Sequence, residues 1–377
     1  MGISVDKIFP VQYQSYLDKI KNPNLLNDIQ QKINKELNAN QSLQQRHIKA
    51  TDETPVSIDF IGNGETTQVY VRFNRNKIVP NIGEGCLKCA EAAFDKNGEK
   101  KVAKRAYLPN VKVYNSQIDP VSLKTNTVYK KIKREMKLEK FLSGSNIDYI
   151  VYEGKDNKTG KPSAVKIAYY ATPYKNNLSD FYKDFKAHYQ NQISNFSPYS
   201  YHQDCKKIAI NALSDLEKLS NFGYIHGDIK PDNLIGDGHL TDFDLSHKKG
   251  ASFSKGCLNL KGAYAYRPPH LILEEKLGDI ELEEQGPRDL FALGVCLYQL
   301  YFNDDFYKSI ELEDLIALRV EARELLKYPN IFNSQFSAPR NWPTPPFDAI
   351  TLLKGLLAPD YKDRLNYEQA LELAKKL

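Results

Sequence analysis

The chain has 377 residues, of which 41% are hydrophobic and 26% charged, and 52 basic against 47 acidic side chains give a net charge of +5. This length predicts two or three globular units with ample core, and the composition excludes a disordered or collagen-like chain. The small basic excess does not indicate nucleic-acid binding, the most apolar stretch (291–302) is too short to span a bilayer, and the first twenty residues lack the apolar core of a secretory signal.

The N-terminal segment, 1–78, predicts an extension that packs onto the following unit. Apolar residues recur at intervals of three to five from Tyr13 to Leu37, with a break at Pro23, which predicts two short amphipathic helices. The runs 56–61 and 69–73 flank a Gly62-Asn63-Gly64 turn and predict a β-hairpin. Beyond residue 78 we expect a small β-rich unit with one helix, at 129–142, and after residue 179 a larger helical unit.

Cysteine usage indicates the compartment. The five cysteines are an odd number at irregular positions, which is typical of a reducing compartment rather than of a disulfide framework. Cys86 and Cys89 form one Cys-x-x-Cys pair, but no second pair or nearby histidine completes a zinc set. We therefore expect both to be ordinary strand residues.

The segment 226–244 carries the most chemical information. It reads His226-Gly227-Asp228-Ile229-Lys230-Pro231-Asp232-Asn233, then a Gly236-Asp237-Gly238 turn, then Leu240-Thr241-Asp242-Phe243-Asp244. Two short strands about this turn would gather four polar side chains around one point. Phosphoryl transfer needs oxygen ligands for Mg²⁺, which Asn233 and Asp242 can supply, and a separate carboxylate, Asp228, to orient the attacking hydroxyl. Lys230 can neutralise charge on the transferred group.

These motifs resemble the catalytic loop and metal motif of eukaryotic-type protein kinases, and the resemblance extends from about Lys77 to Leu377. The family pattern His-Arg-Asp-x-Lys-x-x-Asn is matched except at Gly227, and Asp-Phe-Gly is matched except at Asp244. The segment 262–270 resembles the end of the activation loop, and Asp289 resembles the residue that braces the catalytic loop. Arg364 matches a late structural arginine whose usual Glu partner is His270 here, so the resemblance implies Glu274 or Glu275 as its partner.

In the N-terminal half, chain order extends the resemblance to the nucleotide-binding residues. Gly83 and Gly85 stand where a glycine-rich loop covers the phosphates, although Lys88 occupies the place of the third glycine. Tyr170 and Ala171 fall in the hinge expected near Tyr169 to Thr172, so the resemblance implies that they bind the nucleotide.

The order of the motifs along the chain also indicates the phosphate-binding lysine and its acidic partner. Lys104 matches the lysine that pairs with the α- and β-phosphates, and Glu135 on the 129–142 helix matches its acidic partner, with Glu139 as the alternative. Lys166 is a second candidate for the lysine. Because the expected helix precedes Lys166 in the chain, the family order favours Lys104.

The resemblance implies an α+β, bilobal protein-kinase-like fold with an N-terminal helical and hairpin extension (1–78), a β-rich N-lobe (79–172) and a larger α-helical C-lobe (173–377). It implies ATP with Mg²⁺ or Mn²⁺ as cofactors and transfer of the γ-phosphate to Ser/Thr hydroxyls of a protein substrate. Three alternatives stay open. They are a small-molecule kinase of the aminoglycoside or choline-kinase type, whose loop also reads His-Gly-Asp; a pseudokinase scaffold; and a kinase-fold enzyme that transfers AMP.

The glycine at position 227 also bears on regulation and origin. In relatives, the arginine at this place receives the phosphorylated activation loop, so a phosphate on Ser246, Ser252 or Ser254 lacks that partner here. A polyanion bound to the basic run 130–137 is another possible activator, against the plainer interpretation of a solvated helix face. Kinase relatives with this glycine and added N-terminal segments include effectors of intracellular bacteria, so we expect a cytoplasmic location or secretion into a host cytosol.

Overall fold

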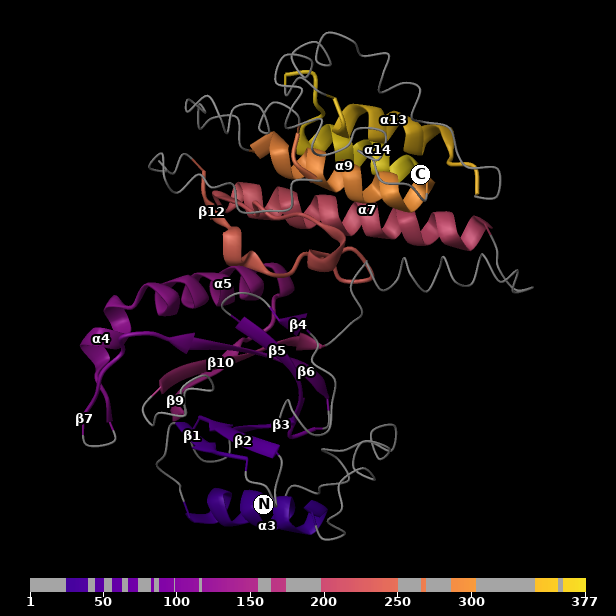
Figure 1. Ribbon diagram of the computed structural model, residues 1–377. Helices are drawn as coiled ribbons and strands as arrows, with labels where there is room; N and C mark the ends of the chain where they lie inside the picture. Colours follow the sequence, from indigo (N-terminus) through magenta and orange to yellow (C-terminus); the bar gives the residue numbers. More distant parts are fainter. Residues whose placement is uncertain are drawn as a thin grey trace. The chain divides into compact units, whose positions relative to one another are not determined.

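The computed structural model divides the chain into two compact units, Met1–Tyr174 and Lys175–Leu377 (Figure 1). No helix among the described residues is long and apolar enough to cross a membrane. The structure describes residues 25–39, 45–50, 56–62, 67–73, 83–84, 88–97, 99–114, 117–154, 164–173, 198–249, 266–268, 286–302, 343–358 and 362–377.

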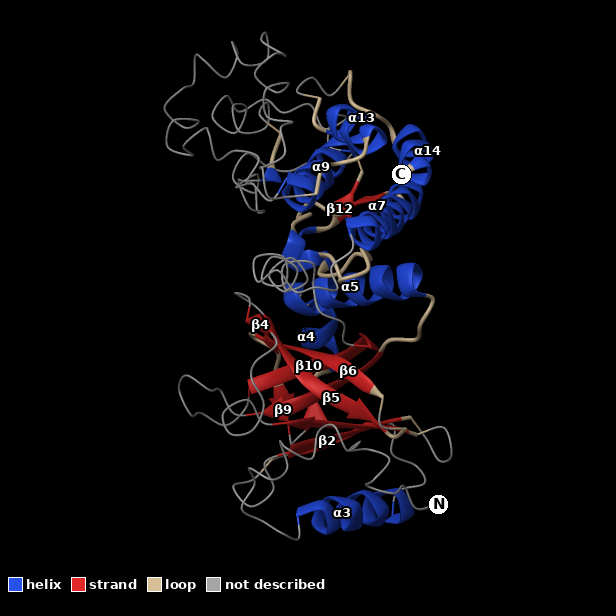
Figure 2. Cartoon of the chain, turned by 90° about the vertical axis from the view of Figure 1, so that its right-hand side faces the viewer, coloured by secondary structure: helices blue, strands red, loops and turns tan. Residues whose placement is uncertain are grey.

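Unit 1 is built on an eight-stranded antiparallel sheet with the order β1-β2-β3-β5-β6-β10-β9, in which β4 also pairs with β5 (Figure 2). The strands are β1 (Gln45–Ile48), β2 (Val56–Ile61), β3 (Gln68–Phe73), β4 (Gly83–Glu84), β5 (Lys88–Asp95), β6 (Lys100–Leu108), β9 (Asp148–Gly154) and β10 (Ala164–Pro173). A second, two-stranded sheet consists of β7 (Val113–Tyr114) and β8 (Gln117–Ile118).

The N-terminal extension continues the main sheet of unit 1. The predicted hairpin is confirmed as β2 and β3, paired from Val56↔Phe73 to Ile61↔Gln68. Strand β3 then pairs with the last residues of β5, while β4 pairs with its beginning. Of the two predicted N-terminal helices, the second is α3 (Leu25–Ala39), which lies beside the β1–β3 end of the sheet in both views, and the first lies outside the described residues.

One face of the sheet is covered by helix α5 (Thr127–Ser143), which confirms the helix predicted at 129–142. The short helix α4 (Pro120–Thr125) precedes it. Asn126 caps α5 by accepting a hydrogen bond from the Tyr129 amide, and Gly144, at φ 67°, ends it in the left-handed conformation. Ile132 and Met136 of α5 pack in one cluster with residues of β6 and β10. Burial of this apolar face holds the helix on the sheet.

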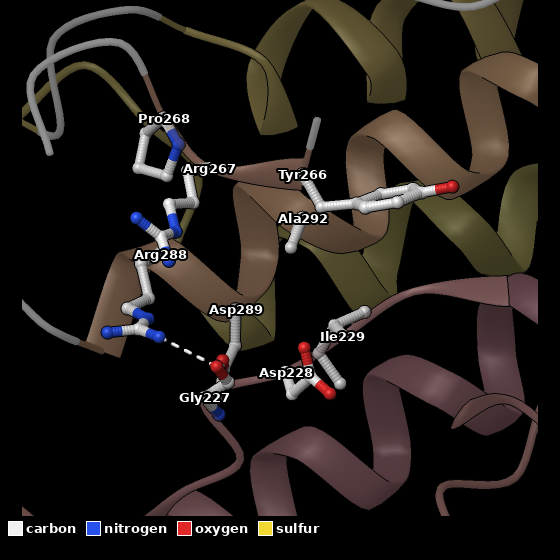
Figure 3. Close-up of a pocket in the computed structure, with 9 residues that line it drawn as sticks. All are labelled: Gly227, Asp228, Ile229, Tyr266, Arg267, Pro268, Arg288, Asp289 and Ala292. Atoms are coloured by element: carbon white, nitrogen blue, oxygen red, sulfur yellow. Dashed lines mark hydrogen bonds between the residues drawn. The ribbon is translucent and has the colours of Figure 1, made fainter. Parts of the chain in front are cut away.

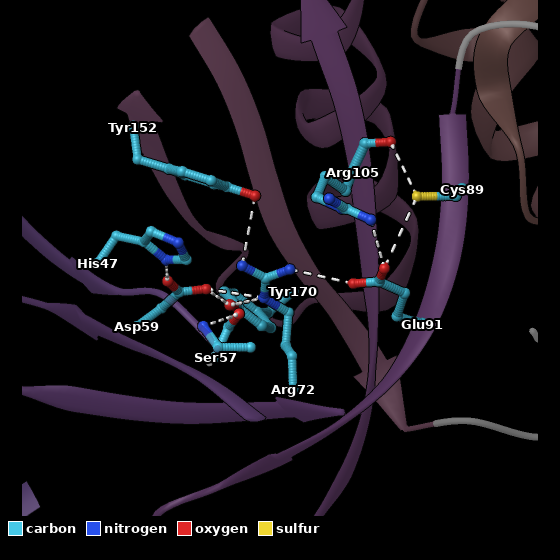
Figure 4. A network of polar contacts seen from close by, with 10 residues as sticks. His47, Ser57, Asp59, Arg72, Cys89, Glu91, Arg105, Tyr152 and Tyr170 are labelled. Atoms are coloured by element: carbon cyan, nitrogen blue, oxygen red, sulfur yellow. Dashed lines mark hydrogen bonds and ion pairs between the residues drawn. The ribbon is translucent and has the colours of Figure 1, made fainter. Parts of the chain in front are cut away.

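The opposite face of the sheet buries a network of charged and hydroxyl groups, seen in Figure 4. At its centre is Asp59 of β2, fully buried, whose carboxylate accepts hydrogen bonds from Arg72 Nε at 2.9 Å and from the Tyr170 hydroxyl. His47 Nδ1 lies 2.5 Å from the same carboxylate. Burial alone would raise the pKa of Asp59, but the charge of Arg72 and the His47 contact outweigh it and bring the pKa to about 2.

The network joins the segment 1–78 to strands β5, β6 and β10 of the same sheet. Arg72 of β3 reaches Glu91 of β5 at 3.0 Å, and Glu91 also binds Arg105 of β6 at 2.5 Å. The two edge strands come together as well, because Gln45 of β1 donates to the Tyr149 carbonyl of β9. The sheet therefore curls around a charged interior to which both parts of unit 1 contribute.

Unit 2 is mainly helical. Its elements are α7 (Pro198–Asn221), β11 (Tyr224–Ile225), the 3₁₀ turns η3 (Pro231–Asn233) and η4 (Phe243–Leu245), β12 (His247–Lys248), α9 (Gly286–Phe302), α13 (Phe347–Leu356) and α14 (Tyr367–Lys376). Helix α9 is buried along almost its whole length and contacts α7 and α13. The loop from β11 to β12 holds the predicted catalytic motifs. Helix α7 contacts β11, at the start of this loop.

The late arginine is buried in unit 2. Arg364 donates two hydrogen bonds to the Ala358 carbonyl, at 2.8 and 3.2 Å, and its guanidinium lies 5.0 Å from the centre of the Phe291 ring. The partners expected for it from the resemblance, Glu274 and Glu275, lie outside the described residues, as does His270.

Candidate active site

The catalytic loop is held by its backbone to the first turn of α9. Asp289 is buried and accepts hydrogen bonds from the amides of His226 at 2.7 Å and Gly227 at 3.0 Å. The His226 ring is buried against Phe243, and its Nε2 lies 3.1 Å from the Thr241 carbonyl. Burial lowers the pKa of His226, so this imidazole is a neutral structural link between the two motifs.

Asp228 is oriented through one of its two carboxylate oxygens. Oδ2 accepts hydrogen bonds from Lys230 Nζ at 3.0 Å and from Asn233 Nδ2 at 2.9 Å. Oδ1 is buried and accepts no hydrogen bond from the residues that the structure describes. The direction of this carboxylate is therefore fixed, and one of its oxygens remains as an acceptor that the described residues do not use.

The two predicted metal ligands lie on adjoining backbone. The Thr241 amide donates to the Asn233 carbonyl at 2.9 Å, which brings Asp242 beside the 3₁₀ turn that carries Asn233. Asn233 is buried and uses its amide nitrogen on Asp228, so the side-chain oxygen is the atom left for a metal ion. An amide oxygen and a carboxylate fit the preference of Mg²⁺ for hard oxygen ligands.

Lys104 of β6 lies between two acidic side chains of α5. Its Nζ is 3.3 Å from Glu135 Oε1 and 3.3 Å from Glu139 Oε1. Glu135 and Glu139 face the sheet one turn apart, and both are buried. The structure thus brings Lys104 together with the expected partner, Glu135, and equally with the alternative, Glu139.

Lys166 lies on the other face of the sheet. In the pairing of β10 with β6, Tyr169 is opposite Lys104, whereas Lys166 is opposite Tyr107. Directly paired residues share a face, and neighbours along a strand alternate between faces. Lys166 therefore points away from the face that carries Lys104, which agrees with the order argument for Lys104.

The expected nucleotide contacts are distributed over both faces. Tyr170 binds Asp59 and stacks on Tyr70 with ring centres 3.8 Å apart, so its side chain belongs to the buried network and not to the face of Lys104. Ala171 is paired with Val102 on the face of Lys104. Gly83 lies in β4 opposite Ala90, and Gly85 lies outside the described residues.

The basic run 130–137 lies on α5. Lys133 places its ammonium 3.9 Å from the centre of the Tyr149 ring, and the other basic side chains are half-buried or exposed. This arrangement fits an ordinary solvated helix face with one cation–π contact. Binding of a polyanionic activator here stays a prediction.

Sequence reasoning missed a second cation at the catalytic loop. Arg288, the residue before Asp289, donates from Nη2 to the Gly227 carbonyl at 2.7 Å. Consecutive residues of α9 thus hold both sides of Gly227, Asp289 through the amide and Arg288 through the carbonyl. The one signal in the sequence was the position of Arg288 next to the expected bracing aspartate.

Gly227 has a conformation that disfavours any side chain. Its φ is 82°, and a Cβ would lie 3.0 Å from the Leu245 carbonyl oxygen. We expect Gly227→Ala to lower the free energy of unfolding by about 1–3 kcal/mol. Gly223→Ala is the matched control, because Gly223 also has a φ of 82° but nothing within 4 Å of its Cβ position. Denaturant titration should find the first variant less stable than the second, and equal losses would contradict the close approach.

The comparisons with known proteins agree with this geometry. The model of the protein kinase domain matches residues 76–374, and the chain belongs to the protein kinase family. It is similar to 3-phosphoinositide-dependent protein kinase 1 of Arabidopsis thaliana (33% identity; 31% of this chain, 25% of the relative). It is also similar to serine/threonine-protein kinase Kist of Rattus norvegicus (27%; 48% and 43%) and to myotonin-protein kinase of Mus musculus (30%; 38% and 22%). The matches span less than half the length of each of these relatives.

Proposed function

We propose that the chain is an ATP- and divalent-metal-dependent protein kinase that phosphorylates Ser and Thr hydroxyls. The observation that supports it most is the state of Asp228, with one carboxylate oxygen held by Lys230 and Asn233 and the other buried without a hydrogen-bond donor among the described residues. A structural carboxylate at such a place would have both oxygens satisfied. An oxygen without such a donor suits a carboxylate that accepts a hydrogen bond from the substrate.

Each residue then has a definite task. Asp228 Oδ1 accepts the proton of the acceptor hydroxyl and orients its oxygen, and Lys230 stabilises the negative charge that develops beside it. Asn233 and Asp242 would hold a metal ion, and Lys104, positioned by Glu135 and Glu139, would contact the phosphates. Metal-bound ATP supplies the γ-phosphoryl group.

Ser/Thr specificity is the finer part of the proposal. It is supported by Lys230 and Pro231 in the catalytic loop, which resemble the Ser/Thr-specific members of the family, and by the similarity to relatives such as serine/threonine-protein kinase Kist. Phospho-amino-acid analysis of a generic basic protein labelled with γ-labelled ATP tests it. Label on phosphoserine and phosphothreonine is expected, and label confined to phosphotyrosine would overturn the specificity.

The alternatives differ in acceptor and in the group transferred. The His-Gly-Asp loop is also the form found in small-molecule kinases. Against that interpretation, the residues that resemble the protein-substrate apparatus are Tyr266, Pro269, Asp289 and Arg364. A scaffold has no need of the set formed by Lys104, Asp228, Asn233 and Asp242.

We further propose a cytoplasmic location, which is supported by Cys89, Cys205 and Cys296 being free thiols.

The two candidate lysines are expected to respond differently to substitution. Lys104→Met removes the cation next to the phosphates and should lower kcat/KM about 10²–10³-fold. Lys166→Met is the matched control, since Lys166 lies on the opposite face of the sheet, and its loss should stay within about threefold once the fraction of folded protein is corrected for. Steady-state kinetics of both variants tests the rank order. If Lys166→Met were the more damaging, the assignment of the phosphate-binding lysine would be wrong.

A further inference from the structure

A small pocket beside the catalytic loop gathers two arginine side chains. It is lined by residues that include Gly227 and Asp228 of the loop, Tyr266 and Arg267 of the segment 266–268, and Arg288 of α9. Figure 3 shows both guanidinium groups on the same side of the pocket, with Asp228 below them. Arg267 is only 4% exposed, so its charge lies almost entirely out of water, and Arg288 is half-buried.

The charge of Arg288 is poorly compensated. Burial lowers the pKa of its guanidinium and the like charge of Arg267 lowers it further, while the carboxylates of Asp289 and Asp228 oppose this without reversing it. Within the described part of the chain, Arg288 makes no ion pair, and its hydrogen bond goes to the neutral carbonyl of Gly227. The adjacent carboxylate, Asp289, already accepts the amides of His226 and Gly227. A half-buried guanidinium in this situation is stabilised by an added anion.

We propose that this pocket binds an anionic side chain of the protein substrate, close in sequence to the acceptor hydroxyl. Arg288 of α9 then supplies the positive charge that an arginine at position 227 would otherwise give. The proposal rests on the proposed kinase function, because Asp228 lines the same pocket and fixes where the acceptor lies. With 3.8 Å between successive Cα atoms, a group held by Arg267 and Arg288 is within about two residues of the acceptor. Two guanidinium groups suit a carboxylate or a phosphate.

The test compares acceptor peptides that contain one serine. Peptides with Asp at each position within two residues of the serine are compared with Asn at the same position, and a third arm carries phosphoserine there. At the favoured position, kcat/KM for the Asp peptide should exceed that for the Asn peptide about tenfold, as expected for a charge-assisted hydrogen bond. An Asp five residues away is the distance control and should have no such effect. Equal rates for Asp and Asn at every near position would overturn the proposal.

Variants assign the effect to the pocket. Arg288→Gln removes the charge and leaves an N–H donor on a shorter side chain, so the Asp-to-Asn ratio should fall to near one. Lys375→Gln, at an exposed site on α14, is the matched control and should keep the wild-type ratio. If Arg288→Gln does not fold, Arg288→Lys takes its place, and its ratio should lie between one and the wild-type value. A wild-type ratio in either Arg288 variant would overturn the assignment.

A binding measurement separates failure of this proposal from failure of the proposed function. Fluorescence anisotropy of labelled Asp and Asn peptides with the full chain needs no phosphoryl transfer. Absence of transfer with about tenfold tighter binding of the Asp peptide, lost in Arg288→Gln, would reject the kinase assignment and retain the anion site. Equal binding of the two peptides would reject the anion site. If phosphatase treatment of the wild type removed activity and Arg288→Gln were insensitive to it, the pocket would hold a phosphate of the chain itself, which would overturn the substrate assignment.

Discussion

Asp228→Ala is expected to lower the rate of phosphoryl transfer about 10³–10⁴-fold while binding of Mg²⁺-ATP persists. Asp228 has a buried oxygen, Oδ1, without a donor among the described residues, and its other oxygen is held by Lys230 and Asn233. Removing a positioned base costs rate, and it need not cost affinity for a nucleotide that it does not contact. Single-turnover kinetics measures the loss, and isothermal titration calorimetry measures the affinity.

Asp242→Ala is the matched variant and should fail in a different way. Because Asp242 is assigned to the metal ion, its removal should weaken binding of Mg²⁺-ATP as well as transfer. The two variants together therefore separate the residue that orients the acceptor from the residue that holds the metal. Unchanged nucleotide affinity in both variants would contradict the metal assignment.

Asp59→Ala is expected to lower the free energy of unfolding by about 3–5 kcal/mol, because it leaves the buried guanidinium of Arg72 without its nearest carboxylate. Asp59 and Arg72 lie on β2 and β3, within the segment 1–78, whereas Glu91 and Tyr170, which bind them, lie on β5 and β10. The loss should therefore appear in the unfolding of unit 1 as a whole. Denaturant titration followed by circular dichroism measures it.

The control for this variant is an exposed ion pair. Glu372 and Lys375 of α14 lie 2.6 Å apart at the surface, and Glu372→Ala should change stability by less than about 1 kcal/mol. The wild type should also show an acid limb that Asp59→Ala lacks. The pKa of Asp59 is lowered from 3.8 to about 2, so its contribution is present above about pH 3.8 and is lost as the pH falls toward 2. Equal stability of Asp59→Ala and Glu372→Ala would show that the network does not hold the extension.

Local periodicity was sufficient to predict the hairpin 56–73 and the helix 129–142, because alternation and capping are encoded by neighbouring residues. The attachment of that hairpin to the catalytic-lobe sheet could not be predicted in this way. It depends on the register of β3 against β5, with Tyr70 opposite Asp95, and a register between distant strands has no local pattern. Asp59 and Arg72 are likewise of residue types that are usually exposed on a strand. They are buried here because the sheet curls around them.

Site residues that belong to one short motif could be predicted from the sequence, whereas a site residue that only the fold brings near could not. The spacing of Asp228, Lys230 and Asn233 is short enough for the sequence to place them together, and the structure joins them by hydrogen bonds. Arg288 lies 61 positions after Gly227, and a single arginine at the start of an apolar helix has no distinguishing pattern. Position 227 therefore has no arginine of its own, as the sequence shows, but the fold places the guanidinium of Arg288 beside it.

Phosphoryl transfer to protein, with Asp228 orienting the acceptor, is measured most directly with ATP labelled separately at the γ- and α-phosphates. The full chain is incubated with each nucleotide, Mg²⁺ or Mn²⁺ and a generic basic protein, with Asp228→Ala as the control, and the products are separated by electrophoresis and thin-layer chromatography. A protein kinase with Asp228 as its acceptor-orienting residue transfers the γ-label, and not the α-label, to Ser and Thr of the protein, and the variant loses this transfer. Transfer of the α-label to protein, or undiminished γ-transfer by Asp228→Ala, would contradict the account.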